Sequence, residues 1–541
     1  MDQLKSGDTE DQSGRGEMDQ LKSGDTEDQS GRGEKDRLKS GDTENQSGTG
    51  EEDRLYEELE LNIERLSKDT GNSPDIRRRS IKLAFPGTES LEAAILFTDG
   101  LADSQAMLDS LLRENVPPAH GVFGAADMLD YLTDSVIGEA SVDRIGTFPE
   151  LYEHLLSGDS ILLLKGSAVA LAVGTRKPKA RGVEEPTVQA VVRGPREGFT
   201  EVLSWNTAMI RRKIKNPRLW FEKRTIGQVT KTEVVLAYIE GLVSLEVLTE
   251  LREKLDKIDT DSILESNFIE ERIVDRKLAL FPTVFNSERP DVVAAQIMEG
   301  RVAILVDGTP FALVVPALFV QFFQSSEDYY QGPIFSSLIR MLRVLAFFLT
   351  LLTPSAYIAI TTFHQELLPT TLLYNLASQR EGVPFPAFVE ALLMEITFEI
   401  IREASVRMPR TIGQSISIVG TLVIGQAAVQ AGLVTAAMVI VVSITAISNF
   451  VMPAFNLGIA ARITRFFLMG LAATFGLFGL FLGTIVIVVR LCSMQSFGVP
   501  YMSPMAPLNL SEQKDTLLRV PLSWMKRRPE EIQKRNLVRQ K

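Results

Sequence analysis

The sequence contains only one cysteine, Cys492, and three histidines, His120, His154 and His364, among 541 residues. One cysteine excludes an internal disulfide framework and a cysteine-based zinc site. The histidines are scattered, and HQE at His364 lacks the H-E-x-x-H spacing of a zinc protease. KGS at Lys165 lacks the upstream glycine spacing of a P-loop, and no G-x-S-x-G elbow occurs. We therefore predict a protein that is not an enzyme and that uses no metal ion or cofactor.

Long hydrophobic runs, in contrast, are abundant in the second half of the chain. Several of them reach the roughly 20 residues that a helix needs to cross a bilayer. The net charge of −12 and the 23% of charged residues are averages over unlike parts, so they describe no single surface. We predict an integral membrane protein with a helical transmembrane domain over residues 333–490 and a C-terminal tail over residues 491–541. The five predicted segments are Ile339–Phe363, Phe388–Ala404, Ile412–Val429, Leu433–Met452 and Phe466–Val489.

The first 51 residues form a polar repeat. A 17-residue unit begins at Met1, at Met18 and at Lys35, and each copy offers one Leu and at most one Met for burial. A segment this polar cannot offset its ordering entropy by burying apolar surface. We predict that residues 1–51 are disordered, and no signal-peptide hydrophobic region is present in them.

Residues 52–332 contain a second, more distant repeat. ILFTDGLADSQAMLDSLL resembles LAYIEGLVSLEVLTELREKL, and LLSGDSILLLKGSAVALAV resembles IMEGRVAILVDGTPFALVV at nearly the same spacing. Each copy indicates a strand that ends at an acidic residue and a glycine, and a later helix that runs into a β-hairpin. We predict a duplicated α/β soluble domain, with subdomain 1 over residues 52–190 and subdomain 2 over residues 191–332. Gly158 and Gly166 should correspond to Gly300 and Gly308, with the same strand order in both copies.

The sequence RGPREG near the joint of the two subdomains fixes backbone turns between charged side chains. We predict a structural corner at an interface, across which its arginines pair, made of Arg193, Gly194, Pro195, Arg196 and Glu197. The basic run Arg176–Arg181 could bind nucleic acid or anionic lipid. Because Glu184 and Glu185 lie beside it, we interpret the run as a solvated loop and predict no nucleic-acid partner.

The second hydrophobic segment carries an acidic stripe. At 100° per residue, Glu395, Glu399 and Arg402 fall on one side of a helix. Charged groups in lipid are costly unless they are paired or face water. Two hypotheses remain open: a salt-bridge cluster, for example with Arg340 and Arg343 of the first segment, or an acidic lining for a cation path.

The third segment has a stripe of small and polar residues, which step by three or four. Such a stripe commonly mediates close helix packing. Several copies around an axis would instead form a narrow pore with polar rings and an apolar collar. The candidate pore-lining residues are Gln414, Ser417, Val419, Thr421, Val423 and Gly425. A small face in the fifth segment, at Gly476, Gly479 and Gly483, indicates packing alone.

Positive residues near the segments predict the orientation. If all five segments cross, the arginine clusters that precede the first segment and follow the second and fourth share one side with the soluble domain. We expect that side to be cytoplasmic. The basic C-terminal tail would then lie outside, unless the second or third segment is re-entrant, and the sequence leaves this question open.

Several motifs together resemble one known family. VVRGPREGFTE, HQELLPTTLL, FPAFVEALLMEITFEIIREASVRMP and IGQSISIVGTLVIGQAAVQAGLV resemble the A subunits of the GerA family of spore germination receptors. The resemblance covers roughly residues 59–522. It implies a two-part soluble domain in the spore core and a multi-pass helical domain in the spore inner membrane. It also implies a homo-oligomeric, pentameric ring that conducts ions in response to nutrients, with a transporter-like B subunit and a lipoprotein C subunit as partners.

Two rival functions belong to other classes. A secondary transporter subunit would move its substrate through one protomer, but the segments show no inverted repeat of the kind that many transporters have. A membrane enzyme would need a nucleophile or a metal constellation. The mass of the detergent-solubilised particle separates a ring from a transporter protomer.

Overall fold

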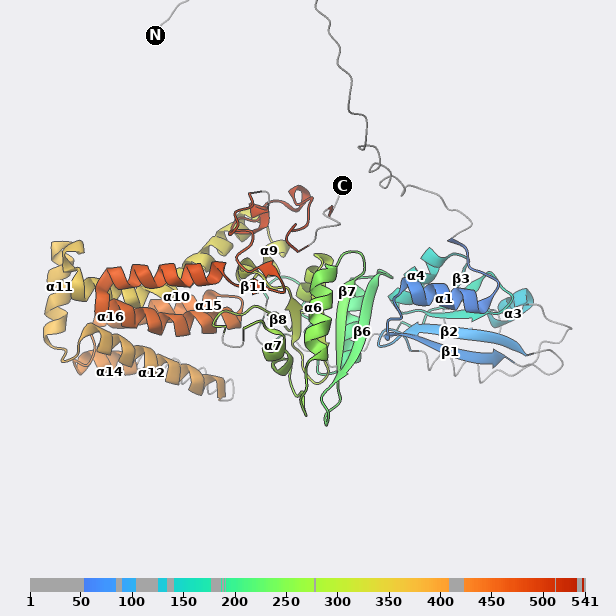
Figure 1. Ribbon diagram of the computed structural model, residues 1–541, viewed down its shortest axis with the longest axis horizontal. Coiled ribbons are helices and arrows are strands. Elements are labelled where there is room, and N and C mark those ends of the chain that lie inside the picture. Colours follow the sequence, from blue (N-terminus) through green and yellow to red (C-terminus); the bar gives the residue numbers. More distant parts are fainter. Residues whose placement is uncertain are drawn as a thin grey trace, which may run out of the picture. The chain divides into compact units, whose positions relative to one another are not determined.

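The computed structural model describes residues 53–83, 90–103, 125–133, 141–176, 186, 189, 191–276, 279–407, 423–510, 512–532 and 538–539. These residues belong to one compact unit, Glu51–Lys541. They form an α/β part, a block of apolar helices and a C-terminal segment (Figure 1). The predicted N-terminal repeats lie outside the described residues.

The first α/β subdomain is a sheet with helices on both faces. Its elements are α1 (Leu59–Asp69), β1 (Ile76–Leu83), β2 (Leu91–Thr98), α3 (Ala125–Tyr131), β3 (Val142–Ile145), α4 (Phe148–Ser157), β4 (Ser160–Leu164) and β5 (Ala170–Val173). The strand order is β1-β2-β4-β5-β3, and every neighbouring pair is antiparallel. Ala94 and Leu96 pack against α1 and α4, while Ala93 and Ile95 pack against α3. Successive side chains of a strand point to opposite faces, so β2 has a core on each side.

The second subdomain has the same architecture. Its elements are α5 (Leu203–Lys213), β6 (Leu219–Ile226), β7 (Thr232–Ile239), α6 (Leu245–Asp256), α7 (Asn267–Ile273), β8 (Phe285–Ser287), α8 (Pro290–Met298), β9 (Val302–Val306) and β10 (Ala312–Val315). The order β6-β7-β9-β10-β8 repeats that of the first sheet, again with antiparallel pairs. Val235 and Ala237 share a core with α5 and α8. Val234 and Leu236 face α6 and α7, which lie beside the sheet in Figure 1.

The predicted correspondence of glycines explains why the two copies fold alike. Gly158 and Gly300, which follow α4 and α8, have φ angles of 101° and 95°. Gly166 and Gly308, in the hairpin turns, have φ angles of 85° and 88°. Positive φ is readily adopted only by glycine, so each pair marks the same turn in both copies. The equal strand order and these paired turns confirm the predicted repeat at the level of topology.

A buried ion pair and a close ring contact join the two subdomains. The guanidinium of Arg211, in α5, donates to both carboxylate oxygens of Asp75 at 2.9 and 3.1 Å, and both residues are buried. Gly71 has a φ of 60°, and a Cβ there would lie 2.2 Å from the ring of Trp220. The joint therefore requires glycine at position 71.

The block of apolar helices follows α9 (Glu327–Tyr330). It consists of α10 (Pro333–Phe363), α11 (Thr370–Glu381), α12 (Ala387–Arg407), α14 (Gly425–Gln430), α15 (Ala436–Val451) and α16 (Phe455–Cys492). By length and composition, α10 and α16 are suited to cross a membrane, and α15 is a shorter apolar helix. The predicted first, second and fourth segments thus correspond to α10, α12 and α15. Most of the third lies outside the described residues.

The fifth predicted segment, Phe466–Val489, is wrong as a single straight helix, because α16 reverses direction at Gly476. That residue has non-helical angles, φ 61° and ψ −143°. A Cβ at Gly483 would lie 2.7 Å from the side chains of Leu468 and Leu471, which precede the reversal. Residues so far apart on one straight helix could not touch, because each residue adds 1.5 Å. The two arms of α16 are therefore antiparallel, and the glycines serve close packing as predicted (Figure 1).

The chain after α16 returns to the second α/β subdomain. A small hairpin of β11 (Gln495–Ser496) and β12 (Val499–Pro500) forms there. The hydroxyl of Ser496 donates to the carbonyl of Thr283 at 2.7 Å and accepts from the amide of Ala317 at 3.0 Å. The Tyr501 carbonyl accepts from the amide of Phe319 at 2.8 Å. The chain that leaves the helical block is thus attached to the second subdomain.

Candidate functional site: charge networks of the helical block

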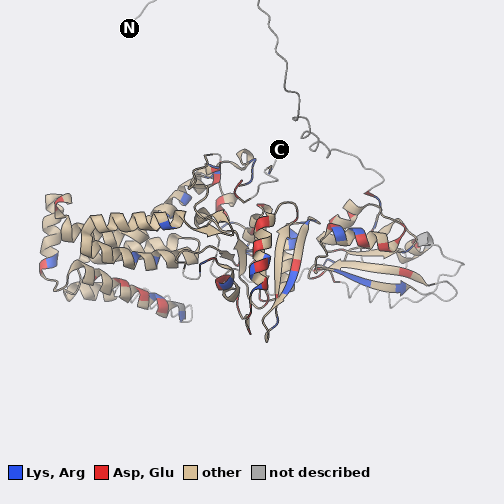
Figure 2. Cartoon of the chain, in the orientation of Figure 1, with Lys and Arg blue, Asp and Glu red and all other residues tan. Residues whose placement is uncertain are grey.

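The acidic stripe of α12 faces two arginines of α16. Figure 2 shows acidic and basic positions along α12, whereas the neighbouring helices are mostly uncharged. An oxygen of Glu395 lies 2.6 Å from Nη2 of Arg465, and the two side chains are 1% and 2% exposed. Because a buried charge without a partner is costly, this pair holds α12 against the first arm of α16.

Glu399 extends the network by one helical turn. Its carboxylate lies 3.1 Å from Arg462 Nη1, 2.7 Å from Arg402 Nη2 and 3.9 Å from Arg465 Nη2. The predicted stripe of Glu395, Glu399 and Arg402 is thus brought together with Arg462 and Arg465. In the sequence, the two α16 arginines indicate only the orientation of the helices. Their spacing of three residues in an apolar helix was the signal that could have identified them as partners.

Arg340 and Arg343, in contrast, do not pair with the acidic stripe, so this part of the salt-bridge hypothesis is wrong. Arg343 Nη1 lies 2.8 Å from Asp328, and Arg340 Nη2 lies 3.1 Å from the same carboxylate. Arg340 also binds Asp515 at 2.9 Å. The first turns of α10 are close in sequence to α9, so its arginines reach the carboxylate just before the helix instead of one on α12.

A further buried carboxylate connects the first turns of α12 and α15. One oxygen of Glu390 accepts from the amide of Thr435 at 2.5 Å and from its hydroxyl at 2.6 Å. The Thr435 hydroxyl in turn accepts from the amide of Met438, which caps α15. An anion at a helix N-terminus is favoured by the free amides there and by the helix dipole.

The RGPREG corner is held mainly through its backbone. A carboxylate oxygen of Glu327, in α9, accepts from the amides of Val192 and Arg193 at 2.5 and 3.0 Å. Gly194 has a φ of 133°, and a Cβ there would lie 2.6 Å from the ring of Tyr330. These contacts attach the corner to the helix that leads into α10.

The rest of the corner contacts the second subdomain. The carbonyl of Pro195 accepts from Arg289 Nη2 at 2.9 Å. Glu197 forms ion pairs with Arg212 at 2.5 Å and Lys213 at 3.6 Å. Arg196 lies between Pro195 and Glu197, in a segment that is neither helix nor strand. The corner thus connects α5, α8 and α9.

The pore-lining candidates are only partly described. Gln414, Ser417, Val419 and Thr421 lie outside the described residues. Val423 is described and is 54% exposed. Gly425 is buried, and a Cβ there would lie 3.5 Å from the side chain of Val439 in α15. In the single chain, Gly425 therefore faces its own protomer and Val423 faces outward.

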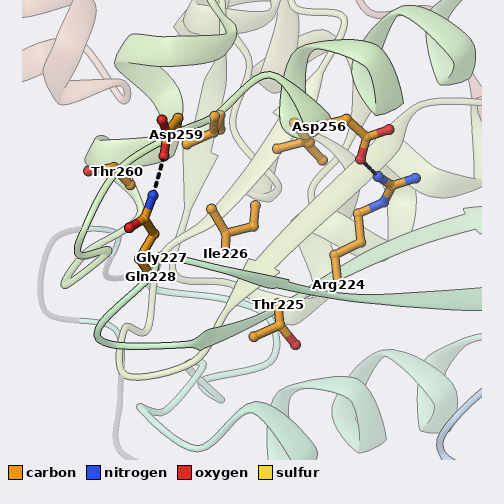
Figure 3. Close-up of a pocket in the computed structure, with 10 residues that line it drawn as sticks. Arg224, Thr225, Ile226, Gly227, Gln228, Asp256, Asp259 and Thr260 are labelled. Carbon is orange, nitrogen blue, oxygen red and sulfur yellow. Dashed lines mark hydrogen bonds and ion pairs between the residues drawn. The ribbon is translucent and has the colours of Figure 1, made fainter.

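A polar pocket of about 410 Å³ lies beside the β6–β7 hairpin (Figure 3). Arg224 forms an ion pair with Asp256 across it, and Gln228 Nε2 donates to Asp259 at 2.7 Å. Two pairs of lining side chains thus bind each other, and the lining residues include no nucleophile beside a base of the kind that covalent catalysis needs. Within the described residues, no group of three or more His, Cys, Asp or Glu side chains could hold a metal ion.

One titratable group of the α/β part has a strongly shifted pKa. Burial raises the pKa of Glu270, in α7, to about 7, and the negative charges of Glu265 and Glu271 add to the shift. Burial disfavours the charged form of a carboxyl group, and neighbouring carboxylates do the same. Glu270 lies apart from the networks of the helical block, so the shift bears on stability.

The fold and these networks define a class of protein. It has a duplicated α/β domain followed by apolar helices, of which two are suited to cross a membrane, and ion pairs join α12 to α16. The family model described as Bacillus/Clostridium GerA spore germination protein matches residues 64–531. The chain belongs to this family, and its relatives support a role in spore germination.

Individual relatives cover most of the chain. "Spore germination protein KA" of Bacillus subtilis is 47% identical over 89% of this chain and 88% of its own length. "Spore germination protein GerLA" of Bacillus cereus is 38% identical over 88% and 96%. Among solved structures, the N-terminal domain of the A subunit of the Bacillus megaterium spore germinant receptor GerK3 is 38% identical, with a TM-score of 0.39. It covers 50% of this chain and 98% of its own.

Proposed function

We propose that this protein is the A subunit of a nutrient-responsive spore germination receptor and that copies of it form an ion-conducting channel in the spore inner membrane. Nutrient sensing opens the channel, and the release of ions triggers germination. A transporter-like B subunit and a lipoprotein C subunit complete the receptor. Family membership supports the role in germination.

The observation that carries the channel proposal is the set of ion pairs between α12 and α16. Glu395 and Glu399 are bound by Arg462 and Arg465, so these charges hold one protomer together and do not form a free acidic lining within it. An ion path is then favoured at the outer faces of several protomers, around a shared axis. Val423, exposed beside α14, is suited to such a position, where one apolar residue per subunit forms a collar.

The proposed topology has an even number of membrane crossings. The first turns of α10 are bound to Asp328, and the chain after α16 is bound to Thr283, Ala317 and Phe319. Two ends that contact the same subdomain support a C-terminus on the side of the α/β domain. The basic tail then shares the cytoplasmic, or core, side with the arginines of α10 and α16, as the positive-inside rule favours. This topology replaces the odd count of five crossings.

The mass and the ion flux of the purified full-length protein test this proposal. We expect a detergent-solubilised particle that contains several copies and liposomes that conduct ions. A particle with one or two copies that transports a substrate without ion leak would favour a secondary transporter and would refute the channel.

The position of the path is tested with single cysteines in a Cys492→Ser background, since Cys492 is exposed. A water-soluble thiol reagent should block flux when the cysteine stands at position 423. A cysteine at Met438, which is buried within the protomer, serves as the control and should leave flux unchanged. Equal block at both positions, or at neither, would contradict the proposed path.

A further inference from the structure

The C-terminal segment exposes large apolar side chains close to the first turns of α10. Leu517, Leu518 and Trp524 are 42%, 54% and 66% exposed. A single exposed leucine is ordinary on a protein surface, but three large side chains within eight residues form a patch that calls for a partner.

Two attachment points fix the position of Leu517 and Leu518 along α10. Upstream, Arg340 Nη1 donates to the carbonyls of Asp515 and Thr516 at 2.7 and 3.1 Å. Downstream, the amide of Arg519 donates to the hydroxyl of Ser337 at 2.9 Å, and that hydroxyl donates to the Arg519 carbonyl at 3.1 Å. Leu517 and Leu518 lie between these points, so they sit at the level of residues 337–340 of α10.

At the same level, α10 itself presents apolar side chains outward. Ile334, Leu338 and Met341 are 86%, 63% and 56% exposed. They begin the apolar surface of a helix suited to cross a membrane. The leucines of the C-terminal segment therefore continue the surface with which α10 would enter a bilayer.

Basic side chains gather beside this patch. A pocket of about 360 Å³ near the end of the chain is lined by Trp524 and by the basic residues Lys514, Lys526 and Arg527. The acidic groups of this pocket are engaged: Asp515 binds Arg340, Glu299 binds Arg539 at 3.1 Å, Glu512 accepts from the amide of Glu530, and Glu530 lies 3.7 Å from Arg527. Within the described residues, Lys514 and Lys526 have no recorded ion pair, so their charges are available to an anion.

We infer that this segment, defined here as the interfacial segment Lys514–Arg527, docks on the anionic surface of the bilayer on the side of the α/β domain. Leu517, Leu518 and Trp524 enter the boundary between headgroups and acyl chains, where tryptophan is favoured. Lys514 and Lys526 bind the phosphate groups of anionic lipids, which attract basic residues near a membrane. The inference rests on the membrane location in the proposed function, but not on the channel.

Tryptophan fluorescence tests the inference on the full-length protein in nanodiscs that contain lipids brominated at shallow acyl positions. We expect bromine to quench part of the emission and the Trp524→Phe variant to lose that quenchable part. The other two tryptophans, Trp205 and Trp220, lie in α5 and β6 of the α/β part and provide the internal reference. Equal quenching of wild type and variant would overturn the inference. If the emission of Trp524 changes only when the oligomer dissociates, the patch contacts a second copy of the chain. That result would also overturn the inference.

A second set of measurements addresses the basic residues. Quenching of Trp524 should increase with the fraction of phosphatidylglycerol, and Lys526→Gln with Lys514→Gln should abolish the increase. Lys257→Gln, at an exposed position after α6, is the matched control and should keep it. Loss of the increase in the control, or its abolition by inorganic phosphate at the same concentration, would refute docking on lipid. Particle mass and ion flux are measured on the same samples. Quenching of Trp524 without ion flux would refute the channel proposal and would leave the docking of the segment on lipid standing.

Discussion

Removing one partner of the Glu395–Arg465 pair tests the role of the buried network most directly. In Glu395→Gln, Arg465 keeps its charge but loses a carboxylate at 2.6 Å, and only the more distant Glu399, at 3.9 Å, remains. Breaking a buried pair in this way typically costs about 3–5 kcal/mol. We expect a large drop in the thermal midpoint of the detergent-solubilised protein and in the amount of assembled particle.

The matched control is Glu403→Gln, which makes the same chemical change on the same helix. Glu403 pairs with Arg407 at 2.7 Å, but these side chains are 55% and 77% exposed. Exposed pairs of this i,i+4 kind contribute only about 0.3–0.5 kcal/mol, so the control should resemble the wild type. A double variant, Glu395→Met with Arg465→Met, removes both charges at similar volume and should recover most of the loss.

Two outcomes would refute this reasoning. If Glu395→Gln and Glu403→Gln have the same midpoint, the buried pair does not hold α12 against α16. If Glu395→Gln keeps normal assembly but lowers cation flux, the carboxylate belongs to an ion path, and the network does more than hold the helices together.

Three further predictions concern other sites. Because the folded state raises the pKa of Glu270 from 4.5 to about 7, its stabilising contribution is complete below pH 4.5 and is lost as the pH rises through 7. Glu270→Gln should therefore be more stable than the wild type above pH 7, by up to about 3 kcal/mol. Its plot of thermal midpoint against pH should be flatter, and a slope equal to that of the wild type would contradict the raised pKa of Glu270. Gly483→Leu should overpack the two arms of α16 and cost about 1–3 kcal/mol by thermal midpoint, whereas Gly470→Leu, with open space around it, should not; equal effects would argue against the hairpin. Val423→Ala should raise resting ion leak in liposomes, whereas Ile440→Ala, exposed on α15, should not; equal leak from both would move the collar elsewhere.

The α/β repeat could be predicted from the sequence because its signals are local. Gly158 and Gly300 end helices, and Gly166 and Gly308 turn hairpins, and all four require positive φ. The apolar runs between them follow the alternation of strands. The repeat also predicts that the two sheets share one strand order, since two copies of one sequence pattern fold in the same way, but it does not give the order itself.

The helical block was harder to predict because its decisive contacts are distant in sequence. Glu399 and Arg462 lie 63 residues apart, and no local pattern pairs them. The reversal at Gly476 was hidden for another reason: a glycine in an apolar helix indicates close packing equally well. Hydrophobicity gives the length of a run but does not report a turn inside it.

The charge network at the start of α10 determines how motion of the α/β domain can reach the helices. Arg340 and Arg343 are buried and share Asp328, and Asp515 binds Arg340 from the C-terminal segment. Separating one such pair costs about 3–5 kcal/mol, whereas coupling between a ligand site and a distant site is typically about 1–3 kcal/mol. A signal of that size is too small to detach α10 from the domain. The first turns of α10 are therefore expected to move together with the second subdomain as one body, so that any motion between the domain and the helices falls on contacts outside this network.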